Sequence, residues 1–432
     1  MTRTRIVIGA IAALAATAIA LFGGVNGTRS QAARPSADGA ILSRLLAGLA
    51  AEDTSRYLAR LERRRPDRDT LLLLGFAYQQ RARETGDPVF FTLSERALRK
   101  AGDAYGSLAT AGLAALAVSR HRFAAALPLA RAALRANPQD ATALGALGDA
   151  LLNLGRYRQA FVAYNRMAEL SPSVSSYSRI AHARELIGRP RAAAEALELA
   201  LSLQLPLREH RAAAFVQLGN LVLGRGDLAR ARRAYASALA TLPGYVHAQA
   251  GLARVAAARG QFREALPLFR RVVDRLPLPQ YAIWYGDALH AAGMTVRAQK
   301  AYAVVSVIER LQAANGVRTE LQTALFDLDH GRRLEDALAR ARDAHARAPS
   351  IDADDVLAWA LVRNGRCGEA LAYSVRALRL GTRDALKLFH RGMIERCLGR
   401  DAEARRWFAR ALDVNPHFSL LWAPVARSYV VN

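Results

Sequence analysis

The chain has 432 residues, of which 52% are hydrophobic and 23% are charged, so it can bury a large core and is not a mostly disordered protein. Only 7% of the residues are aromatic, and the abundance of alanine favours closely packed helices over β-sandwiches. The two cysteines exclude a disulfide-dense scaffold and a zinc site made of four cysteines.

The formal net charge is +24, and nearly all of the basic residues are arginines, since only Lys100, Lys300 and Lys387 are lysines. A basic chain can bind nucleic acid or an anionic surface. Here the arginines are spread along the whole chain, and no basic stretch is interleaved with aromatic residues as a base-stacking surface requires. The charge pattern therefore argues against nucleic acid as the partner.

The N-terminus has the pattern of a targeting segment. Arg3 and Arg5 precede an uncharged run from Ile6 to Phe22, and glycines follow this run. A positive head, an apolar middle and a small-residue exit are typical of a signal peptide, here residues 1–27. The run at 6–22 is also near the lower length limit of a membrane anchor, so both alternatives stay open. Either one places the rest of the chain outside the cytoplasm.

Two short segments separate this N-terminus from the main body of the chain. Residues 28–38 are polar and small, which predicts a flexible linker. Residues 39–67 have helical periodicity and end at Pro66, which predicts a helical cap.

An internal repeat occupies most of the remaining sequence. Glycine, alanine and proline each recur along it with the same spacing, and the three sets keep a constant offset from one another. We call each set of recurring residues a ladder. The glycines are Gly155, Gly188, Gly226, Gly260, Gly293, Gly331, Gly365 and Gly399. The alanines are Ala126, Ala160, Ala193, Ala231, Ala265, Ala298, Ala337, Ala370 and Ala404. The prolines are Pro138, Pro172, Pro243, Pro277, Pro349 and Pro416.

Each repeat predicts two helices joined by a short turn. In residues 141–172, apolar residues at helical spacing precede Gly155, and a second amphipathic stripe follows it. Glycine tolerates the positive φ of a helix-ending turn, and Pro172 cannot continue the second helix. The small residues Gly148 and Ala160 are expected where the two helices cross. About ten such units begin near residues 68, 107, 141, 174, 212, 246, 279, 318, 351 and 385.

The order and period of these residues resemble the tetratricopeptide repeat, a helix–turn–helix unit. The order is clear in Leu218-Gly219, Ala231, Tyr235, Ala238 and Pro243. The resemblance implies an all-α, right-handed solenoid with helical caps, in which residues 68–418 form the repeats. Residues 419–432 are expected to form a C-terminal capping helix, because end repeats otherwise expose their apolar face.

The sequence contains no motif for catalysis or cofactor binding in the structural context that such a motif requires. HExxH, GxSxG and Walker sequences are absent, and the GxGxxA pattern at 224–229 follows a helix where a dinucleotide site requires a strand. We therefore predict no enzyme activity, no catalytic residue, no resident metal and no cofactor.

The resemblance also implies which residues line the concave groove, since particular positions of each first helix face it in tetratricopeptide proteins. Large polar and aromatic residues concentrate at these positions in the units that begin near 279, 318 and 351. The candidate groove residues are Asp287, His290, Gln322, Phe326, Asp329, His330, Asp352, Asp355, Trp359 and Arg363. The same positions in other units hold Asp149, Asn153, His182, Asn220, His247, Arg254, Phe389 and Arg396.

The expected function is a non-catalytic scaffold whose groove binds a protein or peptide segment outside the cytoplasm. Two alternatives stay open. The Asp/His patch suits a metal- or ligand-dependent sensor or enzyme, and the net charge suits an electrostatic envelope or nucleic-acid adhesin.

The two cysteines are candidates for a disulfide. Cys367 follows the turn glycine Gly365, and Cys397 precedes Gly399 at the end of the next first helix. In consecutive antiparallel helices the start of one meets the end of the other, and an oxidising compartment permits the bond. The alternative is that each is a separate small buried residue.

Overall fold

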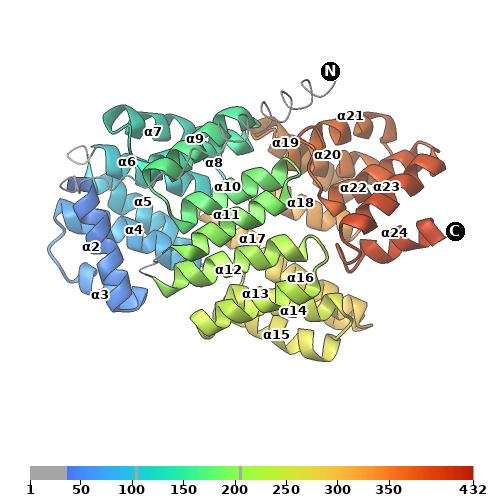
Figure 1. Cartoon of the computed structure of the whole chain (residues 1–432), viewed down its shortest axis with the longest axis horizontal. Helices are drawn as coiled ribbons and strands as arrows, with labels where there is room; N and C mark the ends of the chain where they lie inside the picture. The colour runs from blue at the N-terminus through green and yellow to red at the C-terminus, as the bar shows by residue number, and fades with distance from the viewer. Residues whose placement is uncertain (1–36, 103–105, 204–206, 432) are drawn as a thin grey trace, which may run out of the picture. The chain divides into compact units, whose positions relative to one another are not determined.

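The computed structural model describes residues 37–102, 106–203 and 207–431, and these ranges contain helices and no strands (Figure 1). The chain divides into two compact units, residues 1–40 and 41–432, and the description below concerns the second. The predicted signal peptide or anchor at 1–27 lies outside the described residues, as does the predicted linker up to residue 36. No described helix combines the length and the apolar character needed to cross a membrane.

Within the described ranges, ten antiparallel helix pairs follow one another along residues 68–414, which confirms the predicted all-α solenoid. The first helices of the pairs are α4 (Arg68–Thr85), α6 (Gly106–Ser119), α8 (Ala141–Asn153), α10 (Val174–Leu186), α12 (Arg208–Leu223), α14 (Val246–Ala258), α16 (Pro279–Ala291), α18 (Glu320–Asp329), α20 (Ile351–Arg363) and α22 (Ala385–Cys397). The second helices are α5 (Val89–Ala101), α7 (Phe123–Ala136), α9 (Tyr157–Leu170), α11 (Pro190–Ser202), α13 (Leu228–Thr241), α15 (Phe262–Arg275), α17 (Thr295–Ala314), α19 (Leu334–Arg347), α21 (Cys367–Ala377) and α23 (Asp401–Val414).

Further described helices flank the ten pairs. Helices α2 (Ala37–Ala51) and α3 (Thr54–Glu62) precede them, and α24 (Trp422–Val431) follows them. Asp53 caps α3 by accepting hydrogen bonds from the backbone of Ser55 and Arg56. The apolar face of α3 packs on α4 through Tyr57 and Leu61, which are both buried.

The ladder residues have the roles that the sequence predicts. All eight glycines lie in the turn between the helices of a pair with φ between 65° and 78°, a region that side chains disfavour. The nine ladder alanines are at most 2% exposed. The turn glycines reverse the chain, and the alanines allow the two helices of a unit to approach closely.

A glycine on the first helix makes room for an aromatic ring from the second helix. A Cβ atom added to Gly148 would lie 2.3 Å from the ring of Tyr164, and one added to Gly286 would lie 2.2 Å from the ring of Tyr302. Tyr235 fills two such places, because Gly219 and Gly251 both face its ring. The aromatic rings of the second helices therefore set the spacing of the first helices.

Contacts also join units that are far apart in sequence. The Tyr157 hydroxyl accepts a hydrogen bond of 2.6 Å from the backbone of Ile351, a residue 194 positions later. Asn415 donates a hydrogen bond of 3.0 Å to the backbone oxygen of Leu223, 192 positions earlier. Arg122 similarly donates to the backbone oxygen of Gly316, 194 positions later. The solenoid thus returns on itself and brings units from its two halves into contact.

Candidate functional site

Two adjoining cavities lie along the first helices of the later units. The larger cavity, of about 590 Å³, is lined by residues from α10, α12, α14, α16, α18, α20 and α22 and by the segment 415–420. The smaller cavity, of about 370 Å³, is lined mainly by α18, α20, α22 and the segments that precede them. The residues that line both cavities are Gln322, Leu325, Asp352, Asp384, Leu386 and Lys387. The two cavities therefore adjoin, and we refer to them together as the groove.

The larger cavity combines apolar and charged surfaces. Ile283, Trp284 and Leu325 supply apolar surface, and Gln280 and Gln322 are exposed beside them. Such a mixed concave surface fits a ligand with both apolar and polar groups.

Arg254 covers the ring of Trp284 in the wall of the larger cavity. Its guanidinium lies 4.2 Å from the ring centroid of Trp284 and donates a hydrogen bond of 3.2 Å to Asn220. Burial lowers the pKa of Arg254. No carboxylate within the described ranges lies within ion-pairing distance of it.

A tyrosine from the second helix holds a polar residue of the first helix 15 positions earlier. Tyr164 donates to Asp149 at 2.9 Å, and Tyr302 donates to Asp287 at 2.8 Å. Tyr235 makes the same bond of 2.8 Å to Asn220, and burial raises its pKa to about 12. These tyrosines stay protonated and fix polar side chains of the first helices, of which Asp287 lines the larger cavity.

Two of these carboxylates, Asp149 and Asp287, also bond to the next first helix. Asp149 forms an ion pair of 2.6 Å with Arg179 of α10. Asp287 accepts a hydrogen bond of 2.8 Å from Nε2 of His330, which lies at the end of α18. The Nδ1 atom of His330 lies 2.7 Å from the backbone oxygen of Phe326. Burial lowers the pKa of His330, but the bond to Asp287 outweighs it, so the net pKa is raised.

Asp329 sits between two indole groups. Its Oδ1 atom accepts hydrogen bonds from Trp359 at 3.0 Å and from Trp422 of α24 at 2.9 Å. Burial raises the pKa of Asp329, and the nearby His390 opposes this shift. The guanidinium of Arg363 lies 5.4 Å and 5.6 Å from the two indole rings. The carboxylate therefore ties α18, α20 and the C-terminal helix together.

Trp359 is a core residue in the structure, although the sequence places it on the groove face. It is 0% exposed, because His390 stacks on its ring at 4.5 Å and Trp422 packs against its edge. Asp355 is also buried and accepts a hydrogen bond of 3.0 Å from His390. Trp422 was not among the predicted groove residues, since it lies outside the repeat pattern.

Lys387 lies in the wall that the two cavities share. Its ammonium lies 2.8 Å from Asp352 and 3.2 Å from Asp384, and both carboxylates belong to the shared wall. Burial opposes its charge, but the neighbouring carboxylates raise its pKa well above the ordinary value. Lys387 was not among the predicted groove residues, although it is one of only three lysines in the chain, which was the available signal.

The remaining predicted residues divide into groove-lining and non-lining positions. Asp287, Gln322, Phe326, Asp329 and Asp352 line the larger cavity, and Asp355 lines the smaller one. The predicted residues that line neither cavity are His290, which is exposed, and His330, Trp359 and Arg363. Within the described ranges, no group of three or more His, Cys, Asp or Glu side chains could hold a metal ion.

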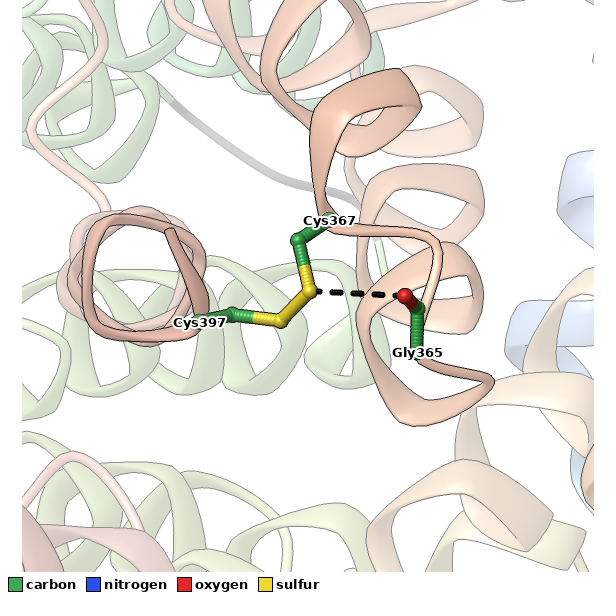
Figure 2. The surroundings of a disulfide bond; sticks show 3 residues. All are labelled: Gly365, Cys367 and Cys397. Carbon is green, nitrogen blue, oxygen red and sulfur yellow. Dashed lines mark hydrogen bonds between the residues drawn. A yellow bond between two sulfur atoms is a disulfide. The ribbon is translucent and has the colours of Figure 1, made fainter. Parts of the chain in front are cut away.

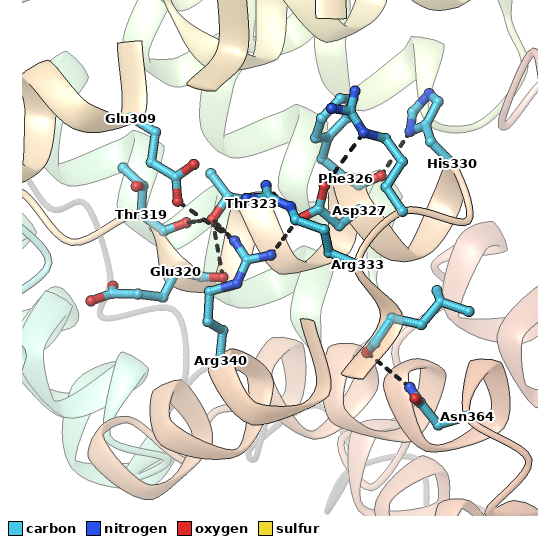
Figure 3. Close-up of polar contacts among 12 residues, drawn as sticks. Glu309, Thr319, Glu320, Thr323, Phe326, Asp327, His330, Arg333, Arg340 and Asn364 are labelled. Carbon is cyan, nitrogen blue, oxygen red and sulfur yellow. Dashed lines mark hydrogen bonds and ion pairs between the residues drawn. The ribbon is translucent and has the colours of Figure 1, made fainter. Parts of the chain in front are cut away.

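A separate buried carboxylate lies on α18, behind the groove. Asp327 is fully buried and is bonded by Arg340 and, at 2.8 Å, by Arg333 (Figure 3). Arg340 also donates to Thr323 at 3.0 Å and lies 3.5 Å from Glu309 of α17. This network fastens α18 to α19 and to the end of α17, and it does not reach either cavity.

A disulfide joins Cys367 and Cys397, with their Cα atoms 5.8 Å apart. Figure 2 shows Cys367 just after the turn of Gly365 and Cys397 at the end of the neighbouring helix. The bond links α21 to α22, so it fastens the ninth unit to the tenth.

Comparisons with known proteins agree with this architecture. Two family models described as tetratricopeptide repeat match the chain, one at residues 222–291 and the other at 111–175 and 356–417. No curated protein matches it.

Several solved structures are similar at low identity. One chain from the crystal structure of the APC/C hetero-tetramer Cut9–Hcn1 is 13% identical. The match covers 92% of this chain and 96% of that chain, with a TM-score of 0.33. A tetratricopeptide repeat protein from Parabacteroides merdae is 15% identical, and the match covers 60% of this chain and 98% of that chain, with a TM-score of 0.35. MamA is 22% identical, and the match covers 39% of this chain and 97% of that chain, with a TM-score of 0.30.

Proposed function

We propose that this tetratricopeptide-repeat protein is a non-catalytic scaffold whose groove binds a segment of another protein outside the cytoplasm. The observation that carries the proposal is the pair of adjoining cavities along the first helices, about 590 Å³ and 370 Å³ in volume. Their common wall presents apolar and charged side chains together, and a polypeptide segment offers both kinds of group.

The bonding of the groove carboxylates supports a binding role over catalysis. Asp287, Asp329 and Asp355 are each hydrogen-bonded to a side chain of a neighbouring helix. Groups engaged in this way hold the groove walls in place, whereas a catalytic acid or base needs access to a reacting atom.

An extracytoplasmic location rests on two observations. The sequence pattern of residues 1–27 is that of a signal peptide or anchor. The bond between Cys367 and Cys397 is of a kind that persists in oxidising compartments. Cell fractionation with an N-terminal deletion tests this part, since the truncated protein is expected to stay in the cytoplasm.

The groove is tested by filling it. Gln322 is exposed and lines both cavities, so Gln322→Trp adds bulk at their junction without entering the core. Gln139→Trp is the matched control, because Gln139 is exposed and lines neither cavity. Proteins that co-purify with the wild type from its own cell envelope should be lost with Gln322→Trp and kept with Gln139→Trp. Equal recovery with both variants would exclude the groove as the binding site.

A further inference from the structure

Helix α17 carries an apolar face that no other described helix covers. It has 20 residues, whereas the second helices of the other described pairs have 11 to 14. Its buried side, which includes Ala298, Val305 and Ile308, packs on the solenoid. The side chains of Val304, Val307 and Leu311 are 37%, 46% and 56% exposed. By the periodicity of the α-helix Val307 lies opposite the buried side, and Val304 and Leu311 lie on the flank next to it.

The spacing of this exposed face matches a helix-pairing seam. Positions 300, 304, 307, 311 and 314 follow one another in steps of four and three residues, and from 304 onward they are Val304, Val307, Leu311 and Ala314. Steps of four and three are the a/d pattern by which one helix packs along another. The stripe is narrow, and a narrow a/d stripe suits a single partner helix better than a broad surface.

Three cations accompany the seam. Arg297, Lys300 and Arg310 are exposed on the same helix. None of them lies within 4.0 Å of a carboxylate among the described residues. The one acidic residue of α17, Glu309, is directed to Arg340 of α19 at 3.5 Å. Positive charge therefore lies at the N-terminal end of the seam, through Arg297 and Lys300, and beside it, through Arg310, and the described part of the chain leaves this charge uncompensated.

From this geometry we propose that α17 is a second interaction surface, distinct from the groove, and that it docks an amphipathic helix with acidic flanks from another protein. The partner helix supplies apolar residues at its own a and d positions and carboxylates beside them, because flanking opposite charges set partner choice in paired helices. A second copy of this chain is disfavoured, since its own α17 carries the same three cations and its one carboxylate, Glu309, is already paired with Arg340.

The test uses the full chain and two synthetic peptides. Both peptides are helices of roughly three heptads with leucine at a and d, and they carry glutamate in one case and lysine in the other at the flanking positions. Binding is measured by fluorescence anisotropy. We expect the glutamate peptide to bind and the lysine peptide to bind at least about tenfold more weakly, because only the former complements the flanking cations.

Two variants and one control locate the site. The double variant Val307→Gln with Leu311→Gln should bind the glutamate peptide at least about tenfold more weakly, because apolar contact is lost. Lys300→Glu with Arg310→Glu should reverse the preference between the two peptides. Val162→Gln, at an exposed valine of α9, should change neither affinity. Circular dichroism should show unchanged helicity, since all these residues are exposed.

Four outcomes would overturn the proposal. Failure of both peptides to bind, or equal affinity for the two, removes the acidic helix as the occupant. Self-association that Val307→Gln with Leu311→Gln abolishes, seen in sedimentation, identifies a second copy instead. If neither peptide binds, but the full chain binds vesicles containing anionic phospholipid and the same variant loses this binding, the occupant is a membrane surface. None of these results bears on the groove, because the residues changed line neither cavity.

Discussion

His330 donates a hydrogen bond of 2.8 Å to Asp287 and so links the first helices of two consecutive units. Both ring nitrogens of His330 face acceptors, since Nδ1 lies 2.7 Å from the backbone oxygen of Phe326. Only the protonated imidazolium can donate both bonds at once. The link between α16 and α18 is therefore strongest when His330 is charged.

The stability of the protein should depend on pH through His330. Burial lowers its pKa, but Asp287 outweighs this and raises the pKa above 6.5, so the folded state binds the proton more tightly than the unfolded state. The contribution is complete below pH 6.5 and is lost as the pH rises through the raised value. His330→Gln should cost about 2 kcal/mol at low pH and less at high pH. Urea unfolding across this pH range measures the effect.

His290→Gln is the matched control for this prediction, because His290 is an exposed histidine of α16. It should leave the free energy of unfolding unchanged at every pH. A difference between wild type and His330→Gln that stays constant from low to high pH would contradict the charged link.

Asp329→Asn should be tolerated, whereas Asp329→Leu should not. Burial raises the pKa of Asp329, so its ionised form costs stability as the pH rises above 3.8. The asparagine amide oxygen still accepts from Trp359 and Trp422 and carries no charge. Leucine leaves both buried indole N–H groups unpaired, which costs about 2 kcal/mol or more. Tryptophan fluorescence during urea unfolding reports both variants, and equal destabilisation by Asn and Leu would refute this account.

Gly251→Ala should be destabilising by about 1–3 kcal/mol, because its Cβ would overpack the core. The added atom would lie 2.3 Å from the ring of Tyr235, which already contacts the neighbouring helix. Gly368→Ala is the control, since nothing lies within 4 Å of its Cβ, and it should be neutral or stabilising. Thermal melting compares the two, and similar melting temperatures would show that the ring can move aside.

Loss of the disulfide should cost about 3–4 kcal/mol by the chain-entropy estimate for a loop of this length. The two cysteines are 30 residues apart, and the sequence contains no others. Reductant should therefore destabilise the wild type and leave the variant with Cys367→Ser and Cys397→Ser unaffected. Two reactive thiols in the denatured, unreduced protein would show that the bond is not formed.

The sequence predicted local structure well because the repeat encodes it locally. A turn glycine such as Gly155 needs only its own φ, and a buried alanine such as Ala160 needs only the opposite helix of the same unit. Both requirements recur once in every unit, so they are visible in the sequence as ladders.

Properties that depend on distant parts of the chain were not predictable in this way. The position of Trp359 on its helix suggested the groove, but Trp422 and His390 cover it from other helices. The wall of the larger cavity likewise combines residues of α10 and α14 with the segment 415–420, which lie far apart in the sequence and meet only after the solenoid has turned. The pitch of a solenoid is a sum of small rotations per unit, so such meetings cannot be found by spacing alone.

The contact of Tyr157 with Ile351 changes how the molecule should fold. An ideal repeat array behaves as a one-dimensional chain in which each unit stabilises only its neighbours and the ends fray independently. Two hydrogen bonds here join residues that are 194 and 192 positions apart, so units also stabilise partners that are not their neighbours in sequence. Melting of the last units then removes partners from the third and fifth units, so unfolding becomes more cooperative. Closing such large loops also costs entropy before any bond forms, so folding should be slower than for an open array of the same length.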